Sequence, residues 1–527
     1  MKKIMCFMFY VAIANVVWSQ GLHVSSGEEF YVSPGNHVYV GGEIDVDASG
    51  TPGKLIVSSN ATTSGSIIVE GNSPSGNITY QRYIDDTKWH LVAPPVVAVA
   101  GYTIPNFVAD AANAVNVKDT DKYAVSYYKN TNLAGNRWVY HKTSADGSVP
   151  NEEALTAFTN GMGYSMNRTS AGLFSFKGLM PTANVTVPLV TAAPSTHYWH
   201  AVGNPYPSFL PVNDDANVVN VVDQNLAVFD TEFAGLYIWD ANLNGGEYTL
   251  INKAYSGAVY LAPGQAFLVN TKDNNESFIF SEALQSHQNG ADTFYRTSQA
   301  PSIVVKLSNG KRNKTTTLKY FSSATTGLDI GYDGGAYQDG SPSFSLDTHL
   351  VSNSQGTDFT LQCLPLDAYE TLVVPLSVRA AANQELSFTV NTTSLPTGVS
   401  VYLEDKVKNS IHNISDAAYS FTPSTPLNGV GRFYIHTSQK SLSVADVNGL
   451  AKVNIYKTSN NILKIIGLEN ANKSRVKVYS ITGKEVLSKN ITAKNVNNIQ
   501  LPKLSAGVYI VKVDSDVKQH TKKIIIE

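Results

Sequence analysis

The stretch RVKVYSITGKEV (residues 475–486) is typical of a β-hairpin close to the end of the chain. Successive side chains of a strand point to opposite faces, so Val476 and Val478 fall on one face and Lys477 falls on the other. Thr482 and Gly483 supply the turn before a second strand. Similar segments recur from residue 450 to residue 527, and about seven short strands of this kind predict an immunoglobulin-like sandwich.

The rest of the chain also consists of short strand-like segments, which predicts an all-β protein of several domains. Residues 301–438 show strands about ten residues apart with Gly, Pro and Asn between them, which indicates a second β-sandwich. Residues 85–300 are expected to form a longer, β-sandwich-like passenger domain, and residues 21–84 a β-solenoid-like or meander region. The polar segment 439–449 is the predicted linker to the last domain, residues 450–527.

The composition also favours strands over long helices. The chain has 527 residues, enough for about three to four domains. Its 39 basic and 42 acidic residues give a formal net charge of −3 without any basic stripe, so nucleic acid is not an expected partner. Charged residues make up 15% of the chain and 28 residues are Tyr, a mixture that favours strands and tight turns. Two short helices are expected, at Phe107–Val115 and Glu152–Thr159.

The first twenty residues have the pattern of a secretory signal peptide. Two lysines precede the apolar run Ile4–Trp18, and the small residue Ser19 follows it. We therefore expect residues 1–20 to be removed during export, with a membrane anchor as the alternative. No later run reaches the roughly 18 apolar residues that a spanning helix requires, so no transmembrane segment is expected after cleavage.

Three motifs in the last domain resemble those of a known sorting signal. They are the hairpin through Gly483, the stretch LSAGVYIVKV (residues 504–513), and a basic closing strand. On these motifs the domain resembles the type A sorting domain of type IX secretion cargo. Ser505 departs from the family pattern, because many members carry proline there. The residues that carry the resemblance are Gly483, Gly507, Tyr509, Lys512, Lys518 and Lys522.

The resemblance implies a route and a location. The protein would cross the inner membrane, fold in the periplasm and be recognised through this domain by the type IX translocon. The C-terminal signal peptidase of that system would then remove the domain, and the passenger would be released or attached to surface lipopolysaccharide. The mature protein would thus be secreted or lie at the cell surface. The alternative is a terminal immunoglobulin-like binding domain that stays attached.

No pattern in the sequence carries a convincing catalytic site. His197 and His200 lie in a strand-like stretch that would point them to opposite faces, unlike the paired histidines on a zinc-protease helix. Cys363 lies in an apolar strand and is expected to be a buried small hydrophobe. Neighbouring acids do not flank a glycosidic bond, so three adjacent pairs are expected to be solvated. These pairs are Asp85-Asp86, Glu152-Glu153 and Asp214-Asp215.

Two groups of residues remain as candidate ligand sites. Asp329, Asp333 and Asp339 lie among several glycines and could wrap a calcium ion with oxygen ligands, with a plain turn as the alternative. No other cofactor is indicated. Five aromatic residues in strand-like segments could stack on sugar rings if exposed, or fill a sandwich core if buried. They are Trp138, Tyr140, Trp199, Tyr237 and Trp239.

These features predict a multi-domain, all-β protein that acts outside the cell as a binding, adhesin-like or structural module. The expected class of ligand is a glycan. The alternative function is a secreted hydrolase that acts on polysaccharide or protein. An enzyme requires acids or histidines that converge on one pocket, whereas a binding module shows a shallow aromatic patch.

Overall fold

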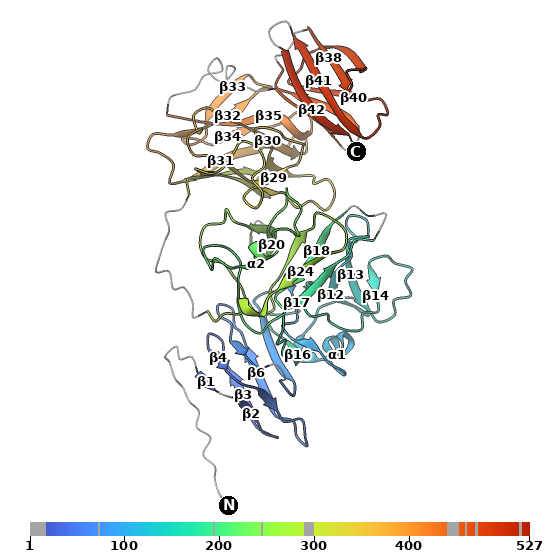
Figure 1. The fold of residues 1–527 in the computed structure, drawn as a ribbon, viewed down its shortest axis with the longest axis vertical. Coiled ribbons are helices and arrows are strands. Elements are labelled where there is room, and N and C mark those ends of the chain that lie inside the picture. Colours follow the sequence, from blue (N-terminus) through green and yellow to red (C-terminus); the bar gives the residue numbers. More distant parts are fainter. Residues whose placement is uncertain are drawn as a thin grey trace, which may run out of the picture. The chain divides into compact units, whose positions relative to one another are not determined.

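The computed structural model shows a protein built almost entirely of short strands, which confirms the all-β prediction (Figure 1). The structure describes residues 17–19, 21–71, 74–192, 195, 197–243, 246–288, 300–439, 453–458, 461–468, 473–515 and 519–526. Within these ranges, no helix has the length and apolar character needed to span a membrane. The chain divides into two compact units, which are Met1–Asp230 with Gly235–Thr297, and Thr231–Ala234 with Ser298–Glu527.

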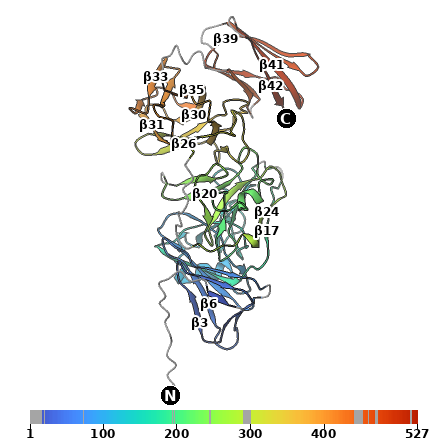
Figure 2. The ribbon, with the colours of Figure 1, turned by 60° about the vertical axis from the view of Figure 1, so that its left-hand side comes forward.

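Unit 1 begins with a coil of parallel strands. The first four strands each pair in parallel with the strand three places further along the chain, so three short strands make one rung, and β6 then pairs in parallel with β8. In a meander, strands that follow one another in the chain pair antiparallel. The parallel pairing therefore shows that, of the two predicted alternatives, the region is β-solenoid-like. Figure 2 shows two of these strands, β3 and β6, side by side. The strands are β1 (Val17–Ser19), β2 (Leu22–Val24), β3 (Glu29–Val32), β4 (His37–Val40), β5 (Ile44–Val46), β6 (Lys54–Ser58), β7 (Ser66–Val69) and β8 (Ile78–Ile84).

The coil continues without a break into the rest of unit 1. Its last strand, β8, pairs antiparallel with β16 (Gly172–Leu179), and one apolar core runs through both regions. The predicted division at residues 84 and 85 therefore does not separate two cores. A six-stranded sheet contains β9 (His90–Val92), β11 (Val117–Asp119), β12 (Lys122–Tyr128), β13 (Trp138–Lys142), β14 (Glu152–Glu153) and β15 (Tyr164–Met166).

The second half of unit 1 adds smaller sheets. The largest has the order β18 (Trp199–Gly203), β23 (Ala266–Asn270), β20 (Leu236–Asp240) and β21 (Glu247–Ile251). Alongside it, β17 (Val185–Leu189) pairs with β24 (Glu276–Phe280), and β19 (Leu210–Pro211) pairs with β22 (Tyr260–Leu261). The short edge strand β10 (Val97–Ala98) pairs with β16.

The two predicted helices have different outcomes. The first becomes α1 (Ile104–Ala109) and a 3-10 turn η1 (Ala111–Asn113), separated because Asp110 is extended and caps the second turn with its side chain. The predicted helix Glu152–Thr159 is wrong, because Glu152–Glu153 is the strand β14. The Glu152 carboxylate lies 2.7 Å from Lys122 Nζ and 3.0 Å from Lys142 Nζ, and these ion pairs together with the ladder to β13 outweigh local helix propensity. Two further helical turns are α2 (Val221–Gln224) and η2 (Glu282–Leu284).

Unit 2 contains a large sandwich made from one continuous hydrogen-bonded sheet. The sheet folds over so that its two halves face each other, because the rings of Phe388 and Phe433 from strands far apart in its order lie 5.0 Å apart in the core. Its strands are β25 (Ser302–Ser308), β26 (Asn313–Phe321), β27 (Gly334–Gly335), β28 (Ser345–Thr348), β29 (Phe359–Pro365), β30 (Val373–Ala380), β31 (Leu386–Thr393), β32 (Ser400–Asp405), β33 (Ser410–Asn413), β34 (Tyr419–Phe421) and β35 (Leu427–Ser438).

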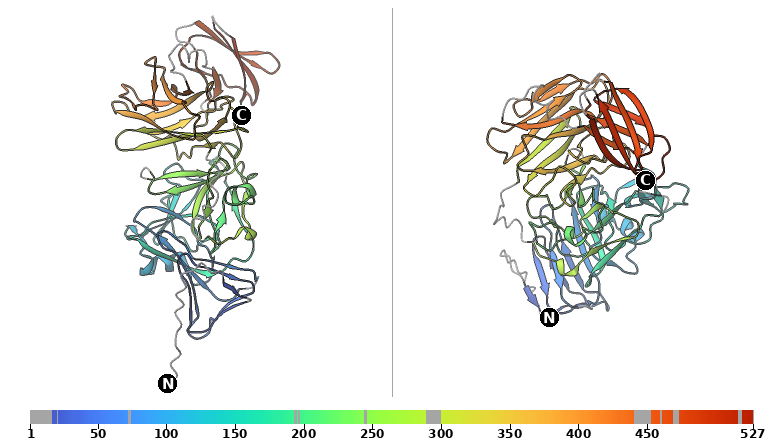
Figure 3. Two further views of the ribbon diagram at one scale, coloured as in Figure 1. Left: turned by 90° about the vertical axis from the view of Figure 1, so that its left-hand side faces the viewer. Right: turned by 45° about the horizontal axis from the view of Figure 1, so that its top comes forward.

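The last strands of unit 2 form the predicted small sandwich. One sheet has the order β36 (Asn454–Lys457), β37 (Ile462–Ile466), β40 (Val496–Gln500). The other has the order β39 (Glu485–Thr492), β38 (Lys473–Ser480), β41 (Gly507–Ser515), β42 (Gln519–Ile526), and Figure 3 shows these strands side by side. Val476 and Val478 are fully buried and Lys477 is not, so the alternation read from the hairpin is confirmed. The predicted linker 439–449 lies, after Gln439, outside the described residues.

Candidate functional site

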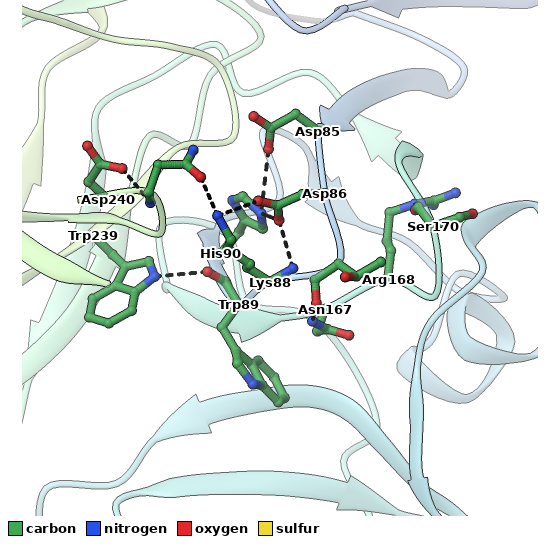
Figure 4. Close-up of polar contacts among 12 residues, drawn as sticks. Asp85, Asp86, Lys88, Trp89, His90, Asn167, Arg168, Ser170, Trp239 and Asp240 are labelled. Atoms are coloured by element: carbon green, nitrogen blue, oxygen red, sulfur yellow. Dashed lines mark hydrogen bonds and ion pairs between the residues drawn. The ribbon is translucent and has the colours of Figure 1, made fainter. Parts of the chain in front are cut away.

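Two acids, a lysine, a tryptophan and a histidine gather in unit 1 where β8 turns into β9 (Figure 4). We call residues Asp85–His90 the β8–β9 corner. The corner is held by a turn in which Asp86 Oδ1 accepts a hydrogen bond of 2.7 Å from the backbone N–H of Lys88. The side-chain amide of Asn167 donates to the Thr87 carbonyl, which fixes the other side of the turn.

Acids and a histidine converge at this corner. His90 Nε2 lies 2.9 Å from Asp86 Oδ1 and 3.7 Å from Asp85 Oδ1. In the described part of the chain, these three residues are the one group of three His, Cys, Asp or Glu side chains whose ligand atoms lie within 4.8 Å of one another. Lys88 Nζ, 3.3 Å from Asp86 Oδ2, already supplies a positive charge there. The group is therefore an ion-pair network as it stands.

The protonation of Asp86 follows from these contacts. Partial burial alone would raise the pKa of Asp86, but the hydrogen bonds from His90 and Lys88 outweigh it and hold the pKa below its ordinary value. Asp86 is thus ionised at neutral pH, and its charge is shared between an imidazole and an ammonium group. Asp85 is exposed and keeps its carboxylate available to solvent.

Aromatic rings and lysines flank the corner. The Trp89 ring lies 5.7 Å from the Tyr140 ring in an edge-on arrangement, and both rings are only partly buried. Lys118 Nζ lies over both of them, 5.0 Å from the Trp89 centroid and 4.5 Å from the Tyr140 centroid. Partial burial, and then repulsion from Lys122, lowers the pKa of Lys118. These contacts are cation–π interactions that order the rings at the surface.

A second tryptophan reaches the corner from β20. Trp239 Nε1 donates a hydrogen bond of 2.9 Å to the Trp89 carbonyl, as Figure 4 shows. Its ring packs edge-on against Tyr248 at 5.0 Å. Gly246 has a positive φ of 112°, and a Cβ at that position would lie 2.4 Å from the indole. Glycine at position 246 is therefore what allows the β20–β21 connection to approach Trp239 so closely.

The five aromatic residues singled out in the sequence separate into two groups. Trp199 and Tyr237 are buried, with exposed fractions of 5% and 1%, and their rings pack edge-on at 4.7 Å. They fill the core, as the alternative interpretation expects. Trp138, Tyr140 and Trp239 are partly buried, and the last two join the corner through Trp89. Trp138 packs instead against Tyr128 at 5.0 Å.

Sequence reasoning missed Trp89 as a candidate site residue. It lies between two strands, where alternation assigns a side chain to neither face. The available signal was the density of chemistry in the run Asp85–His90, which places two acids, a lysine, a tryptophan and a histidine within six residues.

In the described part of the chain, the carboxylates of the three aspartates proposed for calcium do not all lie within 4.8 Å of one another. Asp333 is fully buried and accepts hydrogen bonds from the backbone N–H groups of Cys363 at 2.6 Å and Asp329 at 2.7 Å. Burial raises its pKa to about 7. Asp329 accepts from the N–H of Thr325, and Asp339 is exposed. Two of the carboxylates thus close local turns, and calcium binding there stays a prediction.

The histidines and the cysteine are structural in this arrangement. His200 is buried beside Thr191 and Asn130, and His197 contacts the Tyr128 hydroxyl at 2.6 Å. Burial lowers the pKa of each histidine to about 4, so both are neutral at pH 7. Cys363 is fully buried, as expected.

The sorting residues occupy defined places in the small sandwich. Gly483 has a φ of 82° in the β38–β39 turn, and Gly507 has a φ of 153° at the start of β41. The Tyr509 hydroxyl donates to the Ser505 carbonyl at 2.9 Å, which fixes the chain ahead of that strand. Lys512 lies on β41 and Lys522 on β42, whereas Lys518 lies outside the described residues.

Comparison with known families gives two matches. A family model described as "Domain of unknown function (DUF8693)" matches residues 8–436. A second, described as "Secretion system C-terminal sorting domain", matches residues 457–527. No curated protein matches the chain.

Comparison with solved structures gives weak likenesses. The BSP domain of a biofilm associated protein is 9% identical, with 86% of this chain and 96% of that chain covered and a TM-score of 0.17. A tetra-tandem repeat from the extending region of a large adhesion protein is 12% identical, with 58% and 96% covered and a TM-score of 0.12. Dimeric latent PorU from Porphyromonas gingivalis is 11% identical, with 68% and 35% covered and a TM-score of 0.16.

Proposed function

Because the chain belongs to the DUF8693 family and carries a secretion-system sorting domain behind that region, we propose that its passenger is an exported, adhesin-like binding module. The proposed ligand is a glycan, held at the β8–β9 corner and the aromatic rings that flank it. The observation that carries this proposal is the edge-on contact of the partly buried Trp89 and Tyr140 rings under Lys118, with the partly buried Trp239 hydrogen-bonded to the Trp89 carbonyl beside them.

The export of the protein is inferred from its C-terminal sorting domain. The match of the sorting-domain model to residues 457–527 confirms the resemblance read from the motifs. The protein is a type IX secretion cargo, and it is secreted or lies at the cell surface. Its sorting domain is handled by the type IX secretion machinery.

The binding half rests on the chemistry of the rings. One side of a sugar ring presents C–H groups, which carry a small positive charge and attract the negative face of an indole or phenol. Exposed polar groups beside the rings, including Asp85 and Lys88, can bond the sugar hydroxyls. Lys118, next to both Trp89 and Tyr140, adds a cation for a carboxylate or sulfate on the glycan. The arrangement therefore offers both carboxylates and ammonium groups to the polar groups of a glycan.

The experiment is a glycan array and a pull-down with insoluble polysaccharides, using the purified protein. Trp89→Ala should weaken binding about tenfold, which corresponds to about 1.4 kcal/mol. Trp138→Ala is the matched control, because the Trp138 ring packs against Tyr128 at 5.0 Å. Both variants should have the same melting temperature as the wild-type protein. Binding that survives Trp89→Ala, or no binding to any glycan, would contradict the proposal.

The group formed by Asp85, Asp86 and His90 supports a second candidate function, which is a hydrolase that acts on the glycan held beside it. Asp86 and His90 are within hydrogen-bond distance and adjoin the same rings. Turnover would appear as new reducing ends during incubation with the bound polysaccharide. If turnover occurs and Asp86→Asn abolishes it while binding persists, the protein is an enzyme and the binding role is secondary.

A further inference from the structure

Unit 1 holds a partly enclosed pocket of about 150 Å³ on the side of the coil, separate from the residues of the β8–β9 corner. Its walls come from β10, from the segment through α1 and η1, and from β16. Its size is comparable to that of engineered protein cavities that bind benzene. A single six-membered ring is therefore the natural size of occupant.

The floor of the pocket is a cluster of three phenylalanine rings. Phe107 stacks on Phe176 at 5.2 Å, and Phe158 packs edge-on against each of them at 5.1 Å and 5.4 Å. All three are at least nine-tenths buried, with exposed fractions between 2% and 8%. The rings pack rigidly against one another, so the floor is preformed and apolar. It would receive the flat face or the edge of another aromatic ring.

The mouth of the pocket is polar and carries a cation. Lys177 Nζ lies 5.4 Å above the ring of Tyr102, which is 37% exposed at the rim. The one acid among the lining residues is Asp110, whose Oδ1 accepts a hydrogen bond of 3.0 Å from the Ala112 N–H. That bond directs the Asp110 carboxylate toward the η1 turn, whereas the Lys177 ammonium group lies over the Tyr102 ring at the rim.

From this combination we infer that the pocket binds a single aromatic ring that carries a carboxylate. The ring would lie on Phe107, Phe158 and Phe176, and the carboxylate would pair with Lys177 at the rim. The site differs from the proposed glycan surface in place and in chemistry, because it is an enclosed apolar pocket with one cation. It would give the exported protein a second, small-molecule ligand.

The test is a fluorine NMR titration of the purified protein with 4-fluorophenylacetate. The probe should bind saturably with a dissociation constant on the order of 1 mM, as expected for so small a ligand. The neutral analogue 2-(4-fluorophenyl)ethanol should bind about twofold to fivefold more weakly, the contribution of one exposed ion pair. The amine 4-fluorophenethylamine should bind more weakly still.

Three variants separate the parts of the site. Lys177→Met should remove the preference for the carboxylate and keep binding of the neutral ring, whereas Lys54→Met, at an exposed lysine on β6, should change nothing. Asp110→Asn keeps the cap on η1 and should leave the affinity for the carboxylate equal or higher. Ala98→Phe should fill the pocket and abolish binding of every probe.

Several results would overturn the inference. The first two are an NMR response to the carboxylate probe that never saturates, and binding of the amine that equals or exceeds that of the carboxylate. The other two are a preference for the carboxylate that survives Lys177→Met, and unchanged binding of the probes to a folded Ala98→Phe variant. If Ala98→Phe does not fold, the decision rests on saturation transfer in the wild-type protein. Transfer to the probe from phenylalanine ring protons supports the pocket, and transfer from lysine and surface methyl protons alone rejects it.

Discussion

Two neighbouring buried aspartates in the large sandwich have pKa values that are shifted in opposite directions. Asp358 accepts hydrogen bonds from His349 Nε2 at 2.9 Å, from Arg379 at 2.6 Å and from Gln338 at 3.0 Å. Burial alone would raise its pKa, but these partners outweigh burial and hold the pKa well below the ordinary value. Asp347, on β28, is 6% exposed, and its Oδ2 has no hydrogen-bond partner. Burial, and then repulsion from Asp358, raises its pKa.

The Asp347 carboxyl, whose Oδ2 lacks a hydrogen bond, gives the first prediction. A folded-state pKa above the unfolded value means that the native state holds a proton that the unfolded chain releases, so stability falls as pH rises from about 4 toward the folded pKa. Asp347→Asn removes that titration. We expect it to raise the free energy of unfolding at pH 8 by about 1–3 kcal/mol and to change it little at pH 4. Denaturant unfolding across pH 4–9 measures the difference.

Asp358→Asn is the matched control for that prediction. It breaks a buried network and leaves Arg379 with a weaker partner, so it should destabilise the protein by about 3–5 kcal/mol near neutral pH. Its effect should shrink as pH falls through the depressed pKa of Asp358. A destabilising Asp347→Asn at pH 8 would show that the ionised form of Asp347 has a stabilising partner.

At the scale of the element, strands could be predicted from the sequence because each carries its own pattern. The ranges His37–Val40, Ile462–Ile466 and Gln519–Ile526 are short runs that contain β-branched residues between polar corners, and such runs predict strands. The strand β14 could not be predicted, because Glu152 is held by lysines that come from β12 and β13, and Glu153 by Lys129, just after β12. The candidate site was visible only in part for a similar reason. Trp89 gains its role from Tyr140, Lys118 and Trp239, which are distant in sequence.

The next prediction concerns the start of β41. Gly507 has a φ of 153°, and a Cβ there would meet only the Tyr509 ring at 3.9 Å, so the obstacle to substitution is backbone conformation and not space. Gly507→Val should cost about 1–3 kcal/mol locally and shift Tyr509, which the sorting motif contains. We expect the variant to collect in the periplasm, measured by fractionation and immunoblotting. Ala506→Val, at the exposed neighbouring position, should be exported normally. Equal export of the two variants would contradict this role for Gly507.

At the scale of the whole molecule, the sorting function and the passenger should be separable. Removal of residues 441–527 deletes both sheets of the small sandwich, which has its own apolar core. We expect the shortened protein to remain in the periplasm, folded and resistant to protease, with no protein in the medium or on the surface. Its appearance outside the cell would contradict the need for the tail. Rapid proteolysis of the retained protein would contradict the predicted domain boundary.

The positions of the first and last strands, β25 and β35, inside the sheet of the large sandwich have a mechanical consequence. β25 is bonded on one side to β26 and on the other to β31, and β35 lies between β30 and β32. Both ends of this domain therefore enter it through interior strands. A pull along the chain must shear two ladders of hydrogen bonds together at each end and cannot peel a single edge. Were the protein to bind through the β8–β9 corner, as proposed, and stay attached to the cell through residues beyond 438, tension between these two points would pass through this sandwich.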